Sequence, residues 1–368
     1  RDVLISHGHQ VIIITTGLKG QKKFSFEDGI MRIPGASLKF LYDYRMSFWF
    51  NREAYQALKK IPFDLFHIQQ EFGVSIFGRI CAKLFDVPLV YTYHTSYADY
   101  SNYVSHTKVS ERYTKKVIVT LVKKILSMKG EIITPSLKTR KILLSYGVTR
   151  YINVVPNAID FSSYGKEKDE EREKWFRKEL GIEGKRILLY LGRVAKEKNI
   201  EELMRGFNGY KLRYNDMKSI LLIVGSGPDM ERLIAIKETL SFKDDIYFLG
   251  KVPHEDTMFY YQIADAFLSA SLSETQGLTY SEAIASSCLV LAKYDFNLDF
   301  LLQDGVTGFI YDDIDSLIDK IDEVLSLTKE EKEKVILNAK RRNNYLFSKE
   351  NYYERIMHVY RKAIRHRF

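Results

Sequence analysis

The chain has 368 residues, of which 45% are hydrophobic and 28% are charged, and this balance excludes a disordered or fibrous protein. No apolar run approaches the ~20 residues that a membrane-spanning helix needs, which excludes an integral membrane protein. At roughly 150 residues per domain, the length predicts two domains. Two cysteines, Cys81 and Cys288, are too few for a disulfide framework, so we expect both to be buried thiols in a reducing cytoplasm.

The formal net charge of +9 is divided unevenly along the chain. Residues 1–150 hold 23 Lys and Arg against 11 Asp and Glu, a net charge of +12, and the remainder carries −3. Such asymmetry favours an anionic partner for the first half, either nucleic acid or an acidic membrane surface. A solvated basic face without a partner is the alternative.

The first residues resemble the end of a helix, closed by Gly8 and followed at once by a strand. In a doubly wound sheet the strand before such a helix usually lies at the centre. We therefore expect the sequence to be a fragment of a longer chain. A domain that assembles without that strand is the alternative.

Short β-branched runs alternate with helical stretches along the whole chain. We predict strands at 10–15, 65–69, 89–93, 131–135 and 152–155, and a second series at 186–193, 219–224, 246–249, 266–270 and 289–292. This spacing is typical of βαβ units, so the predicted fold class is α/β with two doubly wound domains. A charged run between the two series, residues 165–178, suits an exposed helix or linker. We assign residues 1–160 and 161–345 to the two domains and 346–368 to a last helical segment.

A basic amphipathic segment spans residues 106–129. Its cations are Lys108, Arg112, Lys115, Lys116, Lys123, Lys124 and Lys129, and the apolar residues between them are Val117, Ile118, Leu121, Val122, Ile125 and Leu126. Such a helix can lie on an anionic leaflet, where each Lys or Arg contributes ~1 kcal/mol. Packing of the apolar stripe into the protein core is the alternative. The aromatic-rich residues 40–50 suit either a patch for acyl chains or a core helix.

The run Gly-Arg-Val-Ala-Lys-Glu-Lys-Asn at 192–199 follows a predicted strand and leads into a helix. Ligands of open α/β sheets bind beyond the carboxyl ends of the strands, so Arg193 and Lys198 are delivered to a site. Two fixed cations there can neutralise a diphosphate without a metal. An ordinary basic surface at a helix start is the alternative.

Two glutamates, Glu274 and Glu282, are separated by seven residues around the start of another predicted helix. We expect Glu274 in the loop and Glu282 in the first turns, with the free amides near Gly277 forming an anion site. Carboxylates in these places can accept hydrogen bonds from sugar and ribose hydroxyls. The alternative is a loop carboxylate and a favourable helix dipole.

Together with Gly225-Ser226-Gly227-Pro228, these motifs resemble the retaining family-four glycosyltransferases of the GT-B fold. The resemblance implies two Rossmann-like domains and a C-terminal helix that crosses back to the first domain. It implies that Arg193 and Lys198 hold the donor diphosphate, that Glu274 binds the transferred sugar, and that Glu282 binds the ribose. The further donor contacts that it implies are Gly225, Val252, Gln276, Gly277 and Leu278.

Two segments in the first half of the chain resemble a narrower group within this family. Residues 69–73 and 91–100 are similar to bacterial 1,2-diacylglycerol 3-glucosyltransferases, which make membrane glycolipids. His94 falls where the family keeps a histidine at the interdomain cleft, and it joins Arg193, Lys198 and Glu274 in the implied catalytic set. The alternative is a histidine in the core or in a loop whose ring nitrogens are hydrogen-bonded within the protein. The implied acceptor-side residues are Glu71, Phe72, Tyr97, Asp99 and Tyr100.

The sequence also departs from the family pattern. Ser287 stands where a glycine is common, so we expect this serine in a backbone conformation that glycine takes easily. The family's first strand and its Gly-rich loop, which reaches the donor phosphates, are missing from the sequence.

These features predict a retaining transferase that moves a hexose, taken as glucose from UDP-glucose, to the hydroxyl of a membrane diacylglycerol. The cations and the helix N-terminus would stabilise charge on the leaving diphosphate. No metal or other cofactor is expected. Asp313 and Asp315 are spaced like a metal-binding pair, but they open a predicted helix, which favours helix capping. We expect a cytoplasmic protein, peripheral at the inner face of the cell membrane.

Three alternatives to this prediction stay open. The first is a transferase with a soluble or polysaccharide acceptor, and the second is a nucleotide-sugar epimerase on the same fold. The third is nucleic-acid binding, which the basic charge suggests, but we find no recognition-helix or aromatic-sheet motif and therefore expect no nucleic-acid partner.

Overall fold

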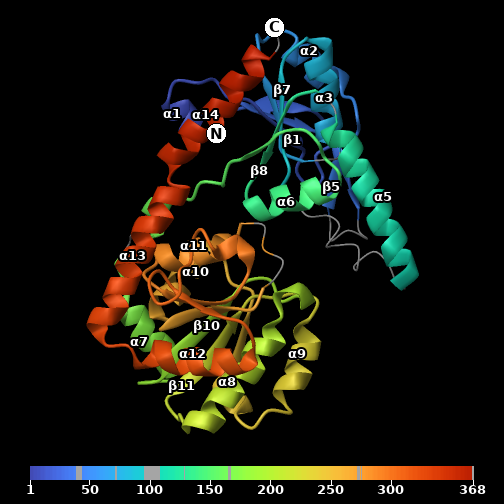
Figure 1. The fold of residues 1–368 in the computed structure, drawn as a ribbon. Helices are drawn as coiled ribbons and strands as arrows, with labels where there is room; N and C mark the ends of the chain where they lie inside the picture. Colours follow the sequence, from blue (N-terminus) through green and yellow to red (C-terminus); the bar gives the residue numbers. More distant parts are fainter. Residues whose placement is uncertain are drawn as a thin grey trace. The chain divides into compact units, whose positions relative to one another are not determined.

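The computed structural model describes residues 1–38, 44–70, 73–94, 108–127, 129–164, 167–271, 274 and 276–366. The chain divides into two compact units (Figure 1). Unit 1 combines residues 1–157 with residues 349–368, and unit 2 comprises residues 158–348. The last helix, α14 (Lys349–Arg365), is therefore part of unit 1 although it follows unit 2 in the sequence.

Unit 1 is an α/β unit whose main sheet has the order β6-β7-β8-β9, with all neighbours parallel. A smaller sheet has the order β1-β3-β2, and β4 and β5 form an antiparallel pair. The elements are α1 (Asp2–Ser6), β1 (Ile13–Thr16), β2 (Ser25–Glu27), β3 (Ile30–Ile33), β4 (Gly35–Leu38), β5 (Tyr44–Ser47), α2 (Arg52–Leu58), β6 (Phe66–Ile68), α3 (Val74–Leu84), β7 (Leu89–Thr92), α5 (Lys108–Leu126), β8 (Glu131–Thr134), α6 (Leu137–Ser145), β9 (Ile152–Val154) and α14.

All five strands predicted for the first half are present, although the first begins at Ile13 rather than residue 10. The core helix that we considered for residues 40–50 is wrong, because this segment contains β5. The side chains that follow β5 point to solvent: Phe48 is 72% exposed and Trp49 is 71% exposed. Phe48 and Trp49 therefore do not pack in a core.

The apolar stripe of α5 packs mainly into the core of unit 1. Val122 and Leu126 are 4% and 2% exposed, and Ile118 and Ile125 pack against the same cluster. Of the described apolar residues on this helix, Val117 and Leu121 stay exposed. The alternative of core packing is thus confirmed for most of the described stripe, and the described part of the exposed face of α5 carries Lys116, Lys123 and Lys124 beside these two apolar residues.

Unit 2 is built on a six-stranded parallel sheet of order β12-β11-β10-β13-β14-β15. Its elements are η3 (Phe161–Tyr164), α7 (Glu170–Glu179), β10 (Arg186–Leu191), η4 (Lys196–Lys198), α8 (Ile200–Tyr214), β11 (Ser219–Val224), α9 (Met230–Lys237), η5 (Lys243–Asp245), β12 (Ile246–Gly250), η6 (His254–Asp256), α10 (Thr257–Ile263), β13 (Ala266–Ser269), α11 (Leu278–Ala285), β14 (Leu289–Lys293), η7 (Phe296–Leu298), β15 (Phe309–Tyr311), α12 (Ile314–Ser326) and α13 (Lys329–Phe347).

Both faces of the unit 2 sheet are covered, which explains why its strands are continuously apolar. Leu189 and Leu191 of β10 cluster with residues of α10 and α11, whereas Leu188 and Tyr190 cluster with residues of α8 and α12. Figure 1 shows these two pairs of helices on opposite faces of the sheet. All five strands predicted for the second half are present. The charged run before them contains α7, an exposed helix capped by Asp169, as predicted. Both cysteines are buried free thiols, as predicted.

A buried carboxylate ties α14 to the main sheet of unit 1. Glu131 opens β8, and its side chain is 8% exposed. It accepts hydrogen bonds from Lys362 Nζ at 2.8 Å, from His366 Nδ1 at 3.0 Å and from Asn153 at 3.1 Å. Burial acts to raise the pKa of Glu131, but these hydrogen bonds and the Lys362 charge outweigh it, so the pKa lies below its usual value.

We predict that Glu131→Gln lowers the free energy of unfolding of unit 1 by about 1–3 kcal/mol at neutral pH, because Lys362 loses an ionised partner. The pKa of Glu131 is lower in the folded than in the unfolded state. The contribution is therefore present above the unfolded pKa and is lost as the pH falls through the folded pKa. Urea unfolding at neutral and acid pH measures it, with the exposed Glu350→Gln on the same helix as control. A loss that persists undiminished in acid would contradict this account.

Candidate active site

The predicted donor residues meet where the strand order of unit 2 reverses. The chain runs from β10 outward through β11 and β12, and then returns to the other side of β10 as β13. The loops after β10 and β13 therefore leave the same edge of the sheet in opposite directions. Such a switch point is where ligands of open α/β sheets bind.

The backbone of the loop after β10 is held by buried neighbours and a hydrogen bond, whereas the side chain of Arg193 in this loop is exposed. Val194 and Ala195 are fully buried, and the hydroxyl of Tyr190 donates to the carbonyl oxygen of Arg193 at 2.8 Å. Asn199 then takes a left-handed conformation, with φ of 48°, as the chain turns into α8. The guanidinium of Arg193 is thus carried by a fixed backbone at the sheet edge.

Two glycines after β11 hold this loop from the other side. Val194 donates its backbone N–H to the carbonyl of Ser226 at 3.0 Å. A Cβ on Gly225 would lie 1.8 Å from the carbonyl oxygen of Gly192, and one on Gly227 would lie 2.1 Å from that of Val194. The two backbones touch so closely that no side chain fits between them, which gives Gly225 a structural role.

Lys198 and Glu274 form an ion pair between Nζ and Oε1 across the switch point. Both side chains are about one-fifth exposed, at 22% and 19%. The cation predicted for a diphosphate and the carboxylate predicted for a sugar therefore contact each other directly in this structure. Glu274 lies in the loop outside regular structure, as predicted.

The helix N-terminus that we predicted as an anion site belongs to α11. Gly277 is its N-cap, with φ of 74° and no side-chain cap, so the first backbone N–H groups depend on partners from outside the helix. A Cβ on Gly277 would collide with the Tyr280 ring. Gln276 is buried, whereas Leu278 is exposed.

Glu282 lies on α11, as predicted, in a pocket of tyrosines. Tyr261 donates its hydroxyl to Oε2 of Glu282 at 3.3 Å, and Tyr164 forms a second side-chain hydrogen bond with the carboxylate. Burial raises the pKa of Glu282, and His254 and the two tyrosines counteract the rise only in part. Val252 is partly buried against the same side of the unit 2 core.

The sequence analysis missed the residues that hold the start of α8. Glu202 accepts two hydrogen bonds from Lys293 Nζ, at 2.9 and 2.8 Å, and one from the Asn199 side chain at 2.6 Å. This network fixes the residue next to Lys198. The position of Lys293 at the carboxyl end of a predicted strand was the signal that could have revealed it.

In unit 1, His94 lies just after β7, where its Nε2 is 2.6 Å from Oε1 of Gln69. Burial lowers the pKa of His94, so the imidazole is favoured in its neutral form. The predicted acceptor-side residues lie outside the described part of the chain: Glu71, Phe72, Tyr97, Asp99 and Tyr100.

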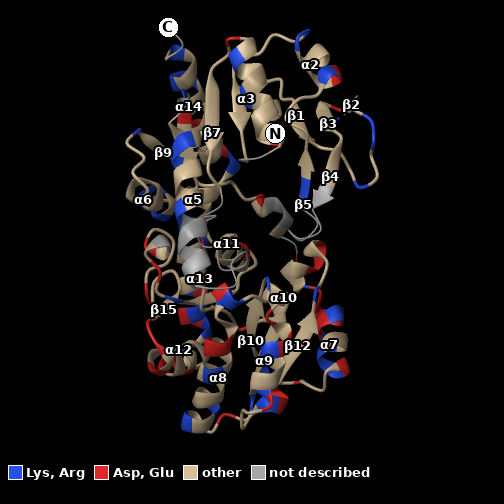
Figure 2. Cartoon of the chain, turned by 90° about the vertical axis from the view of Figure 1, so that its right-hand side faces the viewer, with Lys and Arg blue, Asp and Glu red and all other residues tan. Residues whose placement is uncertain are grey.

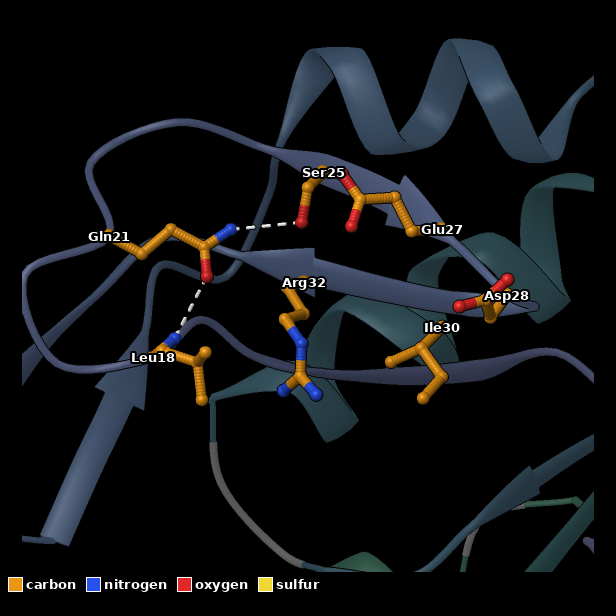
Figure 3. A pocket seen from close by; sticks show the side chains of 7 residues that line it. All are labelled: Leu18, Gln21, Ser25, Glu27, Asp28, Ile30 and Arg32. Carbon is orange, nitrogen blue, oxygen red and sulfur yellow. Dashed lines mark hydrogen bonds between the residues drawn. The ribbon is translucent and has the colours of Figure 1, made fainter.

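A pocket of about 370 Å³ lies elsewhere in unit 1, over the β2–β3 hairpin (Figure 3). Arg32 points into the pocket beside Ile30. Gln21, which also lines it, accepts a hydrogen bond from the backbone N–H of Leu18 and donates one to the hydroxyl of Ser25. None of the predicted site residues lines this pocket. It is therefore separate from the candidate site.

Asp313 is a helix cap, as predicted. Its carboxylate accepts the backbone N–H of Ser316 at 2.9 Å in a capping box, and Asp315 pairs with Arg213 at 3.0 Å. Across the ranges that the structure describes, no group of three His, Cys, Asp or Glu side chains is arranged to hold a metal ion.

We predict that Gly225→Ala lowers the free energy of unfolding of unit 2 by about 3 kcal/mol, because the new Cβ forces the Gly192 backbone to move. Gly184→Ala is the matched control: its φ of +71° is also strained for alanine, but its surroundings are open. Strain of that kind alone costs about 1–2 kcal/mol. Equal shifts of the urea midpoints of the two variants would show that the backbone contact is unimportant.

The chain is similar to known proteins along its whole length. Residues 2–163 match the model of "Glycosyltransferase Family 4", and residues 171–363 match that of "Glycosyl transferases group 1". The alpha-monoglucosyldiacylglycerol synthase of Streptococcus pneumoniae is 32% identical over 98% of this chain and 80% of that protein.

Solved structures share the fold. Sucrose-phosphate synthase from Thermosynechococcus elongatus has a TM-score of 0.72 at 20% identity, over 98% of this chain and 90% of that one. Anabaena HepE in complex with UDP-glucose has a TM-score of 0.67 at 18% identity, over 84% and 81%. The chain therefore belongs to the family-four, group-1 glycosyltransferases and has their GT-B fold of two Rossmann-like units with a long C-terminal helix.

Proposed function

We propose that this glycosyltransferase moves glucose from UDP-glucose to the free hydroxyl of diacylglycerol at a membrane surface, with retention of the anomeric configuration. The observation that carries the proposal is the Lys198–Glu274 pair at the switch point of unit 2, beside the open N-terminus of α11. The similarity to a synthase of glucosyldiacylglycerol supports the lipid acceptor.

The donor site works by exchange of partners in this proposal. In the structure Lys198 and Glu274 neutralise each other. An incoming diphosphate offers Lys198 and Arg193 a stronger anionic partner, which releases Glu274 to accept hydrogen bonds from the hydroxyls of the glucose. Glu282, held by Tyr261, accepts from the ribose in the same way.

The reaction requires stabilisation of negative charge on the leaving diphosphate. As the bond between the sugar and the phosphate breaks, negative charge grows on the diphosphate. Contacts of the loop backbones already position Arg193, Lys198 and the first N–H groups of α11, so once the donor is bound these groups can stabilise this charge with little further reorganisation. The acceptor hydroxyl loses its proton as it attacks, and the departing phosphate oxygen on the same face takes it up.

Unit 1 supplies two features suited to a lipid surface. On α5, Lys116, Lys123 and Lys124 are exposed, and Phe48 and Trp49 expose their rings after β5. Figure 2 shows Lys and Arg residues on the described part of α5. Cations attract an anionic leaflet, and exposed aromatic rings partition into its interface. Within the described residues, no helix has the length and apolar character to cross a bilayer. The exposed cations and aromatic rings are the observations that support peripheral attachment in this proposal.

We predict that Arg193→Gln and Lys198→Gln each lower kcat by about 10²–10³-fold, because each removes a charge that stabilises the leaving diphosphate. The assay supplies radiolabelled UDP-glucose and diacylglycerol vesicles and measures label in the lipid phase. Lys196→Gln, an exposed lysine of the same turn, is the control and should stay within about twofold of wild type. Unchanged turnover in both variants would overturn the proposed donor site.

The same assay separates the other candidate functions. Label in a water-soluble product only would indicate a soluble or polysaccharide acceptor. Consumption of UDP-glucose without any acceptor, together with a changed sugar, would indicate an epimerase. Either result would refute transfer to diacylglycerol.

We predict that the protein sediments with anionic vesicles and that rising salt releases it, because screening weakens the attraction of the α5 cations. Replacement of Lys116, Lys123 and Lys124 by Gln should weaken binding roughly 100-fold, at about 1 kcal/mol for each cation. Three lysines of unit 2, Lys251, Lys329 and Lys334, provide the matched control. Equal losses in the two triple variants would show that net charge, and not α5, carries the binding.

A further inference from the structure

A chain of side-chain contacts, most of them hydrogen bonds, leads from His94 to the C-terminal helix. Nε2 of His94 lies 2.6 Å from Oε1 of Gln69, and the amide nitrogen of Gln69 lies 3.2 Å from each ring nitrogen of His67. The His67 ring is held at 2.7 Å by the hydroxyl of Tyr360, on α14, and at 2.7 Å by that of Thr92. Segments far apart in the sequence, β6, β7 and α14, thus meet at one network within unit 1.

The chemistry of the partners fixes the tautomer of His94. An amide oxygen can only accept, so the Nε2 of His94 must carry the proton that Gln69 Oε1 receives. A neutral imidazole has one donor and one acceptor nitrogen, which leaves Nδ1 of His94 as the acceptor. Nδ1 of His94 can therefore accept a hydrogen bond from a hydroxyl.

His67 provides the rigid base of the network. Burial lowers its pKa to about 3, with a smaller effect of His94, so the ring is neutral. Its nitrogens are bound by two hydroxyls, one of which must donate and the other accept. Tyr360 also packs edge-on against the ring, with centroids 5.5 Å apart. Both ring nitrogens already have a hydroxyl partner at 2.7 Å, so the amide nitrogen of the exposed Gln69 contacts the His67 ring, 3.2 Å from each nitrogen, without a free acceptor there. A rotated amide would lose this contact.

We propose that Gln69, His67 and Tyr360 are positioning residues that hold His94 in the Nε2–H tautomer, with Nδ1 as acceptor for a hydroxyl of the substrates. The inference rests on the proposed function, in which His94 serves the transfer reaction. It assigns the C-terminal helix a second role beyond packing, because Tyr360 supports the candidate catalytic histidine through His67.

A matched pair of tyrosines on α14 tests the role of the helix. Tyr353, like Tyr360, contacts a histidine through its hydroxyl, 3.0 Å from His9 Nε2, but that histidine is not part of the network. Tyr360→Phe should lower kcat at least about fivefold with the KM for UDP-glucose within about twofold, since the donor site lies in unit 2. Tyr353→Phe should leave both constants within about twofold of wild type. Equal effects of the two substitutions would overturn the role of Tyr360.

Two substitutions of Gln69 distinguish positioning from packing. Gln69→Met keeps the length of the side chain but removes the acceptor, so turnover should fall at every pH. Gln69→Glu keeps the acceptor and adds a charge that raises the pKa of His94, so its Nδ1 stays protonated to higher pH. The acid limb of its pH profile should then move to higher pH, with activity recovered in alkali.

The titratable groups that face His94 in the described chain are His67 and, behind it, Tyr360. A Gln69→Glu pH profile with lower turnover but an unshifted acid limb would count against positioning.

A measurement without turnover keeps this inference separate from the proposed function. Nitrogen-15 NMR of histidine-labelled protein, assigned with His94→Asn, reports which ring nitrogen of His94 carries the proton. We expect the Nε2–H tautomer in the wild type and a mixture in Gln69→Met. An Nδ1–H tautomer, or a spectrum that Gln69→Met leaves unchanged, would overturn the inference even if the enzyme transfers glucose. The expected spectra without transfer to lipid would refute the proposed function alone.

Discussion

The ion pair between Lys198 and Glu274 joins the two loops that leave the unit 2 sheet on either side of its switch point. Each loop taken alone would present an unbalanced charge at a partly buried place, which is unfavourable. Paired, the two side chains neutralise each other across the switch point. In the proposed function a diphosphate competes with the carboxylate for the cation, so the contact that balances these charges also marks the proposed donor site.

This arrangement also depends on the contacts that hold the two loops, and not only on the ion pair itself. The loop that carries Arg193 is fixed below by Tyr190 and laterally by Gly225 and Gly227, and the turn after Lys198 is fixed by Glu202 and Lys293. The cations therefore need little reorganisation when a ligand arrives. Electrostatic stabilisation of a transition state is efficient under that condition, because the ordering cost has been met during folding.

The sequence predicted the parallel strands well, and it placed Arg193, Lys198 and Glu274 after the strands that they follow, for one physical reason. Strands covered on both faces are continuously apolar, and their ends mark one edge of the sheet, so Arg193, Lys198 and Glu274 could be placed from the pattern alone. Ser287 also adopts the expected left-handed conformation, with φ of 65°. The short strands β2 to β5 were missed, because they are three or four residues long and pair outside the main sheet.

The supporting shell of the site was beyond prediction because its contacts are distant in sequence. His67 and Tyr360 are separated by 293 residues, and no periodicity records such a pairing. The amphipathic pattern of α5 was ambiguous for another reason: a stripe packed in the core and a stripe buried in a lipid surface have the same spacing. Only the packing of Val122 and Leu126 decides between them.

The path of the chain explains how a terminal helix can serve both packing and the site in unit 1. Unit 2 is inserted between two parts of unit 1, and a backbone hydrogen bond of 3.0 Å from Ile159 to Phe347 joins the points where the chain enters and leaves it. The residues that follow return to unit 1 as α14, where Ile356 and Val359 complete a core with Val90 of β7. Tyr360, the next residue on this helix, then reaches His67. Because the apolar contacts fix the register of α14, the same packing that buries the helix sets the position of the tyrosine hydroxyl.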